Sequence, residues 1–146
     1  MTDRRLAVAA WESLFRAQHD VFADISRDFA EADLDQDEYD VLLTVVRSAG
    51  MTARLRDVTA SMLISQPSVS RLVDRMVTRG LVTKCADPAD GRGALVTATD
   101  AGARAYRSFA VRHARSIARR MRALDDGELR ALLTLTSKLR TRDDRV

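Results

Sequence analysis

Residues 65–80, SQPSVSRLVDRMVTRG, constrain the fold more than any other stretch of this chain. At 100° per residue, a helix over this stretch gathers five apolar residues on one face. Ser65 precedes the helix as its N-cap, and Pro67 stands at the second helical position, where its missing N–H costs no hydrogen bond. The predicted apolar face is Val69, Leu72, Val73, Met76 and Val77, and the opposite face is Pro67, Ser70, Arg71, Asp74, Arg75 and Thr78, with Gln66 and Ser68 flanking its N-terminal end. The pattern predicts a helix that packs on one side and presents hydroxyl and guanidinium groups on the other.

A predicted β-hairpin follows this helix after Gly80. LVTKC and ALVTAT are short β-prone runs, and they enclose DPADGRG, whose Asp, Pro and Gly residues are turn formers. We expect the tip of the hairpin to carry Asp90, Gly91 and Arg92. Because the tip glycines keep the loop slim, the arginine can enter a narrow DNA minor groove, where the negative potential is strongest.

Upstream of residue 65 the pattern predicts two more helices and a short extended segment. LDQDEYDVLLTVVRSAG has Asp35 as its cap, Glu38 three residues later and Gly50 as the expected C-terminal glycine. MTARL predicts an extended segment, and RDVTASML predicts a helix. Two helices joined by a tight turn and followed by a hairpin are the pattern of a winged helix-turn-helix, whose second helix enters the major groove of DNA.

The stretch SQPSVSRLVDRMVTRGLVTKCADPADGRGALVTATDAG resembles the core of the MarR family of transcriptional regulators. In that family a recognition helix ends in an Arg-Gly-Leu-Val-like turn, the wing reads Asp-x-x-Asp-x-Arg, and Thr-x-x-Gly opens the next helix. Here the last two elements are Asp87–Arg92 and Thr99–Gly102. Cys85 stands where the family often has a wing arginine. The resemblance implies a homodimeric repressor that leaves its operator on binding a small molecule, with an effector pocket between the dimer helices and the DNA-binding lobe.

The recognition face supplies the residue types that DNA reading needs. Gln66 can pair bidentately with adenine and Arg71 with guanine, whereas serine hydroxyls contact bases or phosphates and Arg75 suits the backbone. The candidate DNA-binding residues are Ser65, Gln66, Pro67, Ser68, Ser70, Arg71 and Arg75 on the helix and Asp90, Gly91 and Arg92 on the wing. The alternative is a solvated face, on which Arg71 and Arg75 form ion pairs with Asp74 and Arg92 is an ordinary exposed turn residue.

The terminal segments predict long helices with apolar stripes that one small winged-helix core cannot absorb. The helices are expected over about Arg4–Ala30, Ala101–Leu124 and Asp126–Arg140, the last with a capping box of Asp125 and Glu128. Interdigitation with a second copy in a C2 dimer accounts for the stripes, and a monomer that folds these helices back on itself is the alternative. The fold class is therefore mainly α, with 1–34 and 101–146 as a dimerisation region around a DNA-binding lobe at 35–100.

Charge is distributed unevenly along the chain. The net charge is +3 and the sequence pI about 9.6. Residues 20–40 hold nine carboxylates and one base, Arg27, whereas residues 41–146 hold twenty bases and ten acids. Such an asymmetry is typical of proteins with a polyanionic partner, here double-stranded DNA. A signal peptide is not expected, because Glu12 interrupts the apolar stretch that follows the two N-terminal arginines. No apolar run reaches membrane-spanning length, and a lone Cys85 suits a reducing compartment. We therefore expect a cytoplasmic protein without membrane contact.

Catalysis, metals and cofactors are not expected. The chain has no nucleophile elbow and no phosphate-binding glycine loop, and His19 and His113 are too isolated for a metal site. His113 at an apolar helix position suits packing. Trp11, Phe15, His19 and Tyr39 are candidates for lining an effector pocket, although a Trp/Phe stripe at helical spacing also suits a core. Two alternatives stay open beside an operator-reading regulator: a module that coats DNA or docks a protein, and an oxidant sensor that uses Cys85.

Overall fold

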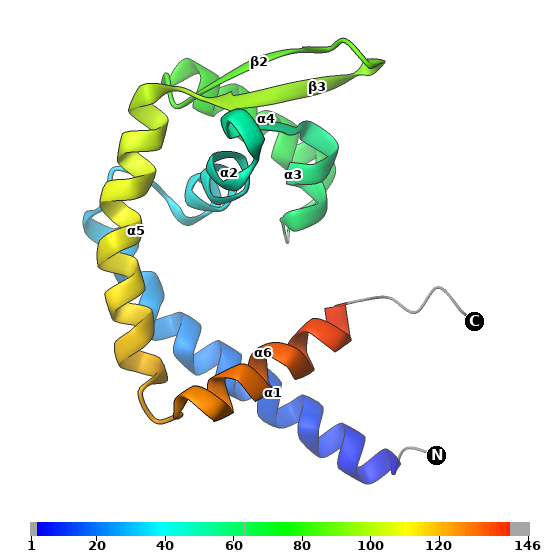
Figure 1. Cartoon of the computed structure of the whole chain (residues 1–146), viewed down its shortest axis with the longest axis vertical. Coiled ribbons are helices and arrows are strands. Elements are labelled where there is room, and N and C mark those ends of the chain that lie inside the picture. The colour runs from blue at the N-terminus through cyan, green and yellow to red at the C-terminus, as the bar shows by residue number, and fades with distance from the viewer. Residues whose placement is uncertain (1–2, 63, 141–146) are drawn as a thin grey trace. The chain divides into compact units, whose positions relative to one another are not determined.

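The computed structural model describes residues 3–62 and 64–140, which form two compact units. One unit combines the residues up to Ile25 with those from Ala114 onward, and the other is Ser26–His113. Figure 1 shows the helices and strands of each. None of the described helices is long and apolar enough to cross a membrane. The fold is mainly helical with one small antiparallel sheet, as the sequence predicts.

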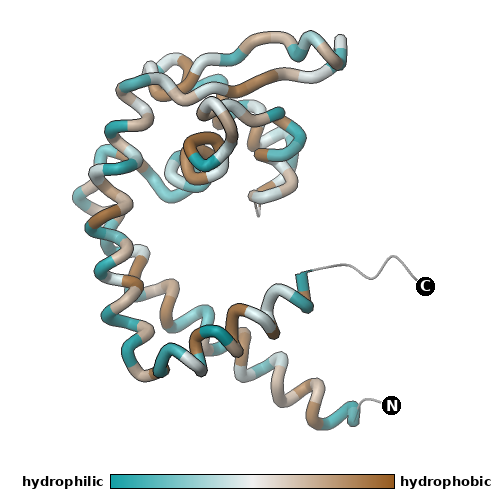
Figure 2. Tube along the Cα trace, in the orientation of Figure 1, coloured by the Kyte–Doolittle hydropathy of each residue, from teal (hydrophilic) through white to brown (hydrophobic). Residues whose placement is uncertain are grey.

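The first unit contains α1 (Arg4–Ile25), the end of α5 (Asp100–Met121) and α6 (Asp126–Arg140). The predicted capping box of α6 is confirmed: Glu128 N–H donates to Asp125 Oδ1 and Asp125 N–H to Glu128 Oε2, each at 2.9 Å. Arg120 Nε donates to Asp24 Oδ2 at 2.8 Å. Hydrophobic positions recur along α1 and α6 (Figure 2), yet both helices lack a fully buried residue among those described.

The first helix ends five residues earlier than predicted. Ser26–Glu31 form a 3-10 helix, η1, instead of the last turns of α1. The physical reason lies in contacts that residues 28 and 29 make with α5. His113 Nδ1 lies 2.8 Å from Asp28 Oδ2, Arg112 Nη2 donates to the Asp28 carbonyl at 3.1 Å, and the rings of Phe29 and Phe109 are 4.5 Å apart. The tighter turns of the 3-10 helix place Asp28 and Phe29 against α5.

The second unit is a winged helix-turn-helix. After η1 come α2 (Gln36–Arg47), η2 (Ala49–Met51), β1 (Thr52–Arg54), α3 (Leu55–Ser61), α4 (Gln66–Thr78), β2 (Val82–Asp87), β3 (Asp90–Ala98) and the start of α5. The strands form an antiparallel sheet in the order β1-β3-β2, with Thr52 opposite Thr97 and Val82 opposite Ala98. The predicted extended segment, hairpin and capping box of Asp35 and Glu38 are confirmed.

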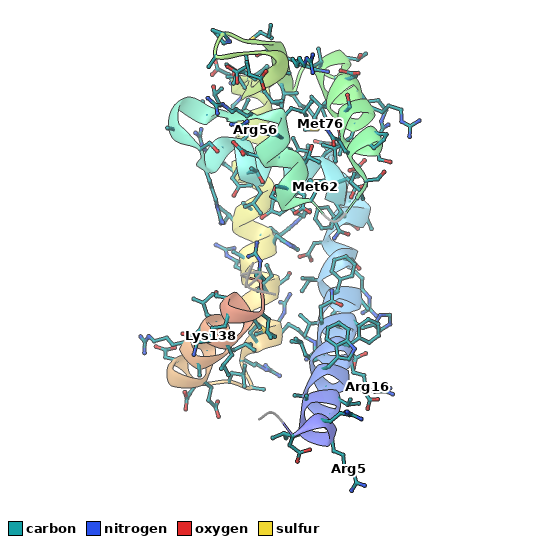
Figure 3. The ribbon with its side chains drawn as sticks, turned by 90° about the vertical axis from the view of Figure 1, so that its right-hand side faces the viewer. Arg5, Arg16, Arg56, Met62, Met76 and Lys138 are labelled. Carbon is teal, nitrogen blue, oxygen red and sulfur yellow. The ribbon has the colours of Figure 1, made fainter. Side chains whose placement is uncertain are left out.

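One hydrophobic core holds α2, α3, α4 and the sheet together. Its fully buried side chains include Leu42, Val45, Val58, Val69, Leu72, Val73, Met76 and Val96. Met62 and Met76, labelled in Figure 3, belong to it. Burying a Val, Leu or Met side chain contributes about 1.5–3 kcal/mol, so the four buried residues of α4 fix its apolar face firmly. Val77 was predicted to share that face but is 40% exposed, because at 100° per residue it lies at the edge of the stripe.

Two glycines predicted to end helices behave differently. Gly80 has φ +73° directly after α4 and its C-cap residue Arg79, as predicted. Gly50 also has a positive φ, +63°, but it lies inside η2, and α2 has already ended at Arg47. Ser48 is the reason: its hydroxyl donates to the Thr44 carbonyl at 2.7 Å and its N–H to the Val45 carbonyl at 3.1 Å, which closes the helix early.

The Thr-x-x-Gly sequence joins the sheet to α5 through a close backbone approach. Thr99 Oγ1 donates to the carbonyls of Gly80 and Leu81 at 2.6 and 3.1 Å, and it accepts the N–H of Gly102 at 3.0 Å. A Cβ at Gly102 would lie 1.9 Å from the Leu81 carbonyl oxygen. Only glycine allows α5 to start this close to the turn that follows α4.

Gly102→Ala is expected to lower the free energy of unfolding by about 3 kcal/mol, because the new Cβ must push α5 away from the backbone of Leu81. Urea unfolding followed by circular dichroism measures this change. Gly91→Ala is the matched control, since a Cβ there meets nothing within 4 Å, and its effect should stay within about 0.5 kcal/mol. Equal effects of the two substitutions would contradict the close approach as the cause.

Candidate nucleic-acid interface

The polar face of α4 is exposed at its N-terminal end, opposite the buried apolar face. Ser65 is the N-cap residue and Pro67 the second residue of the helix, as predicted. The Ser65 side chain makes no capping hydrogen bond, however, and its hydroxyl lies 3.1 Å from the Ser68 hydroxyl instead. Gln66, Pro67, Arg71 and Arg75 are exposed, and Ser68 and Ser70 are half-buried. Backbone N–H groups in the first turn of a helix have no intrahelical acceptor, so this end attracts anions.

The wing is the hairpin of β2 and β3, and its turn consists of Pro88 and Ala89. Asp90, Gly91 and Arg92, predicted at the tip, are the first residues of β3. Asp90 Oδ1 accepts the backbone N–H of Arg92 at 3.1 Å, so this carboxylate braces the strand. The Arg92 side chain is exposed.

The base of the wing is held by a buried carboxylate. Asp87 is buried, its Oδ1 accepts the N–H of Ala89 at 2.9 Å, and its Oδ2 lies 3.1 Å from Arg54 Nε on β1. A second ion pair joins the wing to α4, with Lys84 Nζ 3.0 Å from Asp74 Oδ1. The wing is therefore tied to both β1 and α4.

Recognition-helix and wing residues line one hollow of about 390 Å³. Gln66 and Ser70 come to it from α4, and Asp90 and Arg92 from the wing. Its lining has four basic side chains, Arg54, Arg56, Lys84 and Arg92, against two carboxylates, Asp87 and Asp90, so the basic side chains are in excess. A concave surface with this charge suits a phosphate backbone. Ser68, Arg71 and Arg75 line a separate hollow of about 350 Å³ with Asp37.

Sequence reasoning missed three basic residues of this surface, Arg54, Arg56 and Lys84. Arg56 is exposed on α3 and labelled in Figure 3. No helical or strand periodicity marks these residues, because they come from β1, α3 and β2 and meet only in the folded lobe. The basic excess after residue 41 was the available signal.

The four residues predicted to line an effector pocket belong to different units. Trp11 and Phe15 lie on α1 with their ring centroids 5.8 Å apart and are 62% and 56% exposed, and His19 on the same helix is exposed. Tyr39 belongs to the second unit, where burial and the nearby Tyr106 raise the pKa of its hydroxyl. There it packs in an aromatic cluster with Phe29, Tyr106, Phe109 and His113.

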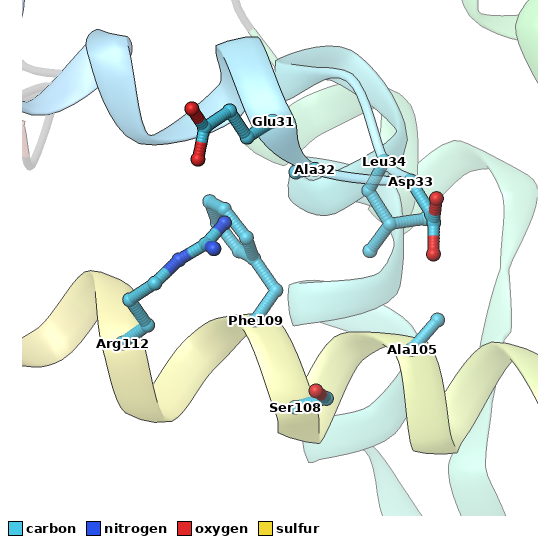
Figure 4. A pocket seen from close by; sticks show the side chains of 8 residues that line it. All are labelled: Glu31, Ala32, Asp33, Leu34, Ala105, Ser108, Phe109 and Arg112. Carbon is cyan, nitrogen blue, oxygen red and sulfur yellow. The ribbon is translucent and has the colours of Figure 1, made fainter.

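Another hollow of about 360 Å³ lies inside the second unit, and Figure 4 shows its lining. Phe109 and Arg112 of α5 face Glu31, the last residue of η1, and the loop that contains Asp33. The Arg112 guanidinium lies 5.5 Å from the centroid of the Phe109 ring. None of the four predicted effector residues lines this hollow. Within residues 3–62 and 64–140, no group of three or more His, Cys, Asp and Glu side chains could hold a metal ion. Cys85 is an exposed free thiol on β2.

Comparisons with known proteins agree with this geometry. Residues 32–93 match the model of the MarR family, which confirms the resemblance. Comparison with curated protein sequences finds no match. The chain is similar in structure to AbsC, a MarR family transcriptional regulator from Streptomyces coelicolor, at 23% identity, a TM-score of 0.79 and coverage of 96% of this chain and 97% of that one.

Two further solved structures are similar over nearly the whole chain. The MarR family regulator Sco3205 from Streptomyces coelicolor, solved in complex with DNA, shares 19% identity at a TM-score of 0.80, with 95% of this chain and 88% of that one covered. BpsR from Bordetella bronchiseptica, whose DNA binding is regulated by 6-hydroxynicotinic acid, shares 26% identity at a TM-score of 0.76, with 90% and 93% covered.

Asp87→Ala is expected to lower the free energy of unfolding by about 2 kcal/mol, because it removes a buried acceptor from the Ala89 N–H and the partner of Arg54. Asp90→Ala, the matched change three residues away at an exposed position, should cost less than about 1 kcal/mol. Thermal unfolding of the two variants tests the difference. A larger loss for Asp90→Ala would show that the wing does not depend on its buried base.

Proposed function

We propose that this chain, a member of the MarR family through its residues 32–93, is a transcriptional regulator that reads a specific sequence in double-stranded DNA as a homodimer. The observation that carries the proposal is the shared hollow, which Gln66 and Ser70 of α4, a helix whose opposite face is buried in the core, line together with Arg92 of the wing. The likeness to Sco3205, which was solved in complex with DNA, supports it.

Each residue of the surface has a role in this proposal. Gln66 and Arg71 read adenine and guanine in the major groove, and Ser68 and Ser70 contact bases or phosphates. Arg75 contacts the phosphate backbone of DNA. Ser65 and Pro67 begin the helix, and its first N–H groups bind a phosphate. Arg92 enters the minor groove, with Asp90 and Gly91 shaping the strand that carries it. Arg54, Arg56 and Lys84 add phosphate contacts around the same hollow.

Arg71→Ala is expected to weaken binding to the operator by about 1–3 kcal/mol and to relax sequence preference, because a bidentate base contact is lost. Arg92→Ala should weaken binding while changing base preference less. Fluorescence anisotropy measures both, with one duplex from the region upstream of the protein's own gene and one scrambled duplex, at several salt concentrations.

Arg122→Ala is the control for the loss of one charge, because Arg122 is exposed in the turn after α5, outside the DNA-binding lobe. Its affinity for both duplexes should remain close to that of the wild type. If the wild type binds the two duplexes equally, operator reading is wrong, and DNA coating without sequence preference takes its place. If Arg92→Ala leaves affinity unchanged, the wing contact is wrong.

Homodimerisation is proposed from the first unit. Large apolar side chains are exposed along α1 and α6, among them Leu6, Trp11, Phe15, Leu133, Leu135 and Leu139. Leu14, Val21, Met121, Leu124 and Leu132 line an apolar hollow of about 400 Å³ beside them. A second copy related by a two-fold axis would bury these side chains and provide two recognition helices for a pseudo-palindromic operator.

Light scattering after size-exclusion chromatography should give a mass near twice 16.2 kDa. The double substitution Leu135→Glu and Leu139→Glu is expected to produce monomers, because it places charges among the exposed apolar residues of α6. The same charges at Thr134 and Ser137, exposed polar positions of α6, should leave the dimer intact. A wild-type mass near 16 kDa would refute dimerisation.

The regulator is proposed to act in the cytoplasm, by binding rather than catalysis, as a repressor that a small molecule releases from its operator. BpsR, whose DNA binding responds to 6-hydroxynicotinic acid, supports this kind of control. Trp11, Phe15, His19 and Tyr39 remain the proposed effector-contacting residues. Such a ligand acts only through different affinities for the DNA-bound and free conformations.

A further inference from the structure

Arg79 ties the C-terminal end of α4 to the segment that begins α2. It is the C-cap residue of α4, and its guanidinium bonds two groups outside that helix. Nη1 donates to Glu38 Oε2, and Nη2 donates to the Asp33 backbone carbonyl at 2.7 Å. One planar group therefore joins α4 both to the first turn of α2 and to the loop before it.

The acceptor side of this tie is fixed independently of Arg79. The Glu38 side chain is only 6% exposed, whereas that of Arg79 is 45% exposed. The other Glu38 oxygen, Oε1, accepts the N–H of Asp35 at 3.1 Å, and the Glu38 N–H donates to Asp35 Oδ1 at 2.8 Å. Because the capping box already holds this carboxylate in place, Arg79 bonds a rigid partner rather than a mobile surface side chain.

The apolar face of α4 alone does not determine the direction in which the helix points. Hydrophobic contacts are non-directional. The buried side chains of Val69, Leu72, Val73 and Met76 therefore oppose removal of α4 from the core more strongly than they oppose a small rotation of the helix on the core. The 13 residues of α4 span about 20 Å at 1.5 Å per residue. A pivot of about 5° at the C-terminal end would therefore move the N-terminal end by about 2 Å. Paired hydrogen bonds from a guanidinium are directional and oppose such a pivot.

We propose that Arg79 is a positioning residue for sequence reading: its bonds to Glu38 and the Asp33 carbonyl set the angle at which α4 presents Gln66, Ser70 and Arg71 to DNA. The inference rests on the proposed function. Bidentate base contacts fail when donor and acceptor move by an ångström or more, whereas phosphate contacts from long basic side chains adapt. Loss of the tie therefore lowers affinity for the operator and leaves affinity for unrelated DNA in place.

Arg79→Lys isolates this effect, because lysine keeps the charge but cannot form the forked pair of bonds. In the anisotropy assay with upstream and scrambled duplexes, we expect Arg79→Lys to weaken binding to the upstream duplex about tenfold. Binding to the scrambled duplex should change less than about twofold, since its electrostatic contribution is unchanged. Glu38→Gln should act similarly, because glutamine can still serve in the capping box but no longer carries the charge that pairs with Arg79.

Two controls separate positioning from loss of folding or charge. Thermal unfolding reports stability, and destabilisation alone would reduce binding to both duplexes through the folded fraction. Arg79→Gln removes a charge at the tie and Arg122→Gln removes one in the other unit, so the specific loss should appear only in the first. Because Arg79 and Glu38 act as one unit, the Arg79→Lys and Glu38→Gln double variant should bind the upstream duplex about as well as the weaker single variant.

The outcomes distinguish this inference from the function on which it rests. A wild-type protein that does not prefer the upstream duplex overturns operator reading, and the positioning role with it. A wild-type preference that persists unchanged in Arg79→Lys and Arg79→Gln overturns the positioning role alone. Equal loss on both duplexes in the folded variants also overturns it, since Arg79 would then contribute general affinity instead of alignment.

Discussion

Burial of one face of α4 is the interaction on which the DNA-binding lobe depends. Val69, Leu72, Val73 and Met76 are almost inaccessible to solvent and sit in a core that also takes residues from α2, α3 and the sheet. At about 1.5–3 kcal/mol each, these four side chains contribute on the order of 6–12 kcal/mol, as much as the whole net stability of a small domain. The opposite face of α4 is therefore not needed for packing and can carry polar side chains that contact a partner.

Three buried ionisable groups at the margins of this lobe each have a partner from a distant part of the sequence. Glu38 bonds Arg79, Asp87 pairs with Arg54, and His113 lies against Asp28. Hydrophobic burial holds elements together without fixing their angles, whereas a buried polar group without its hydrogen-bond partner is costly, so each pair selects one arrangement of the elements it joins. The pairs join α4 to α2, the wing to β1, and α5 to η1.

The pattern of the sequence was sufficient for most elements because their determinants are local. The hairpin, the capping boxes at Asp35 and Asp125 and the packed face of α4 follow from turn formers, cap residues and helical spacing. One error occurs where a distant contact decides: η1 replaces the end of the first helix because His113 and Arg112 hold Asp28, 85 and 84 residues away. The hydroxyl of Ser48, whose hydrogen bond closes α2 before Gly50, is a local signal that was overlooked.

The same division applies to the candidate site. Gln66, Ser70 and Arg92 were predictable because a helix face and a hairpin are visible in the sequence, and they do line one hollow, although Arg92 lies in β3 and not in the turn. Arg54, Arg56 and Lys84 were not, since twenty basic residues follow position 41 and no period selects these three. The partner of Glu38 was equally hidden, because the arginine that bonds it lies 41 residues away.

The free energy that base contacts can provide bears on whether one lobe could distinguish an operator from unrelated DNA. Two bidentate base contacts, from Gln66 and Arg71, would discriminate by about 1–3 kcal/mol each, or about 2–6 kcal/mol in one lobe. Specific regulators separate their sites from unrelated DNA by about 4–10 kcal/mol. A second, symmetry-related lobe doubles the contribution to about 4–12 kcal/mol and covers that range without any new type of contact. In the function proposed above, the exposed apolar residues of α1 and α6 and the polar face of α4 have complementary tasks: the first would join two lobes, and the second would contact DNA in each.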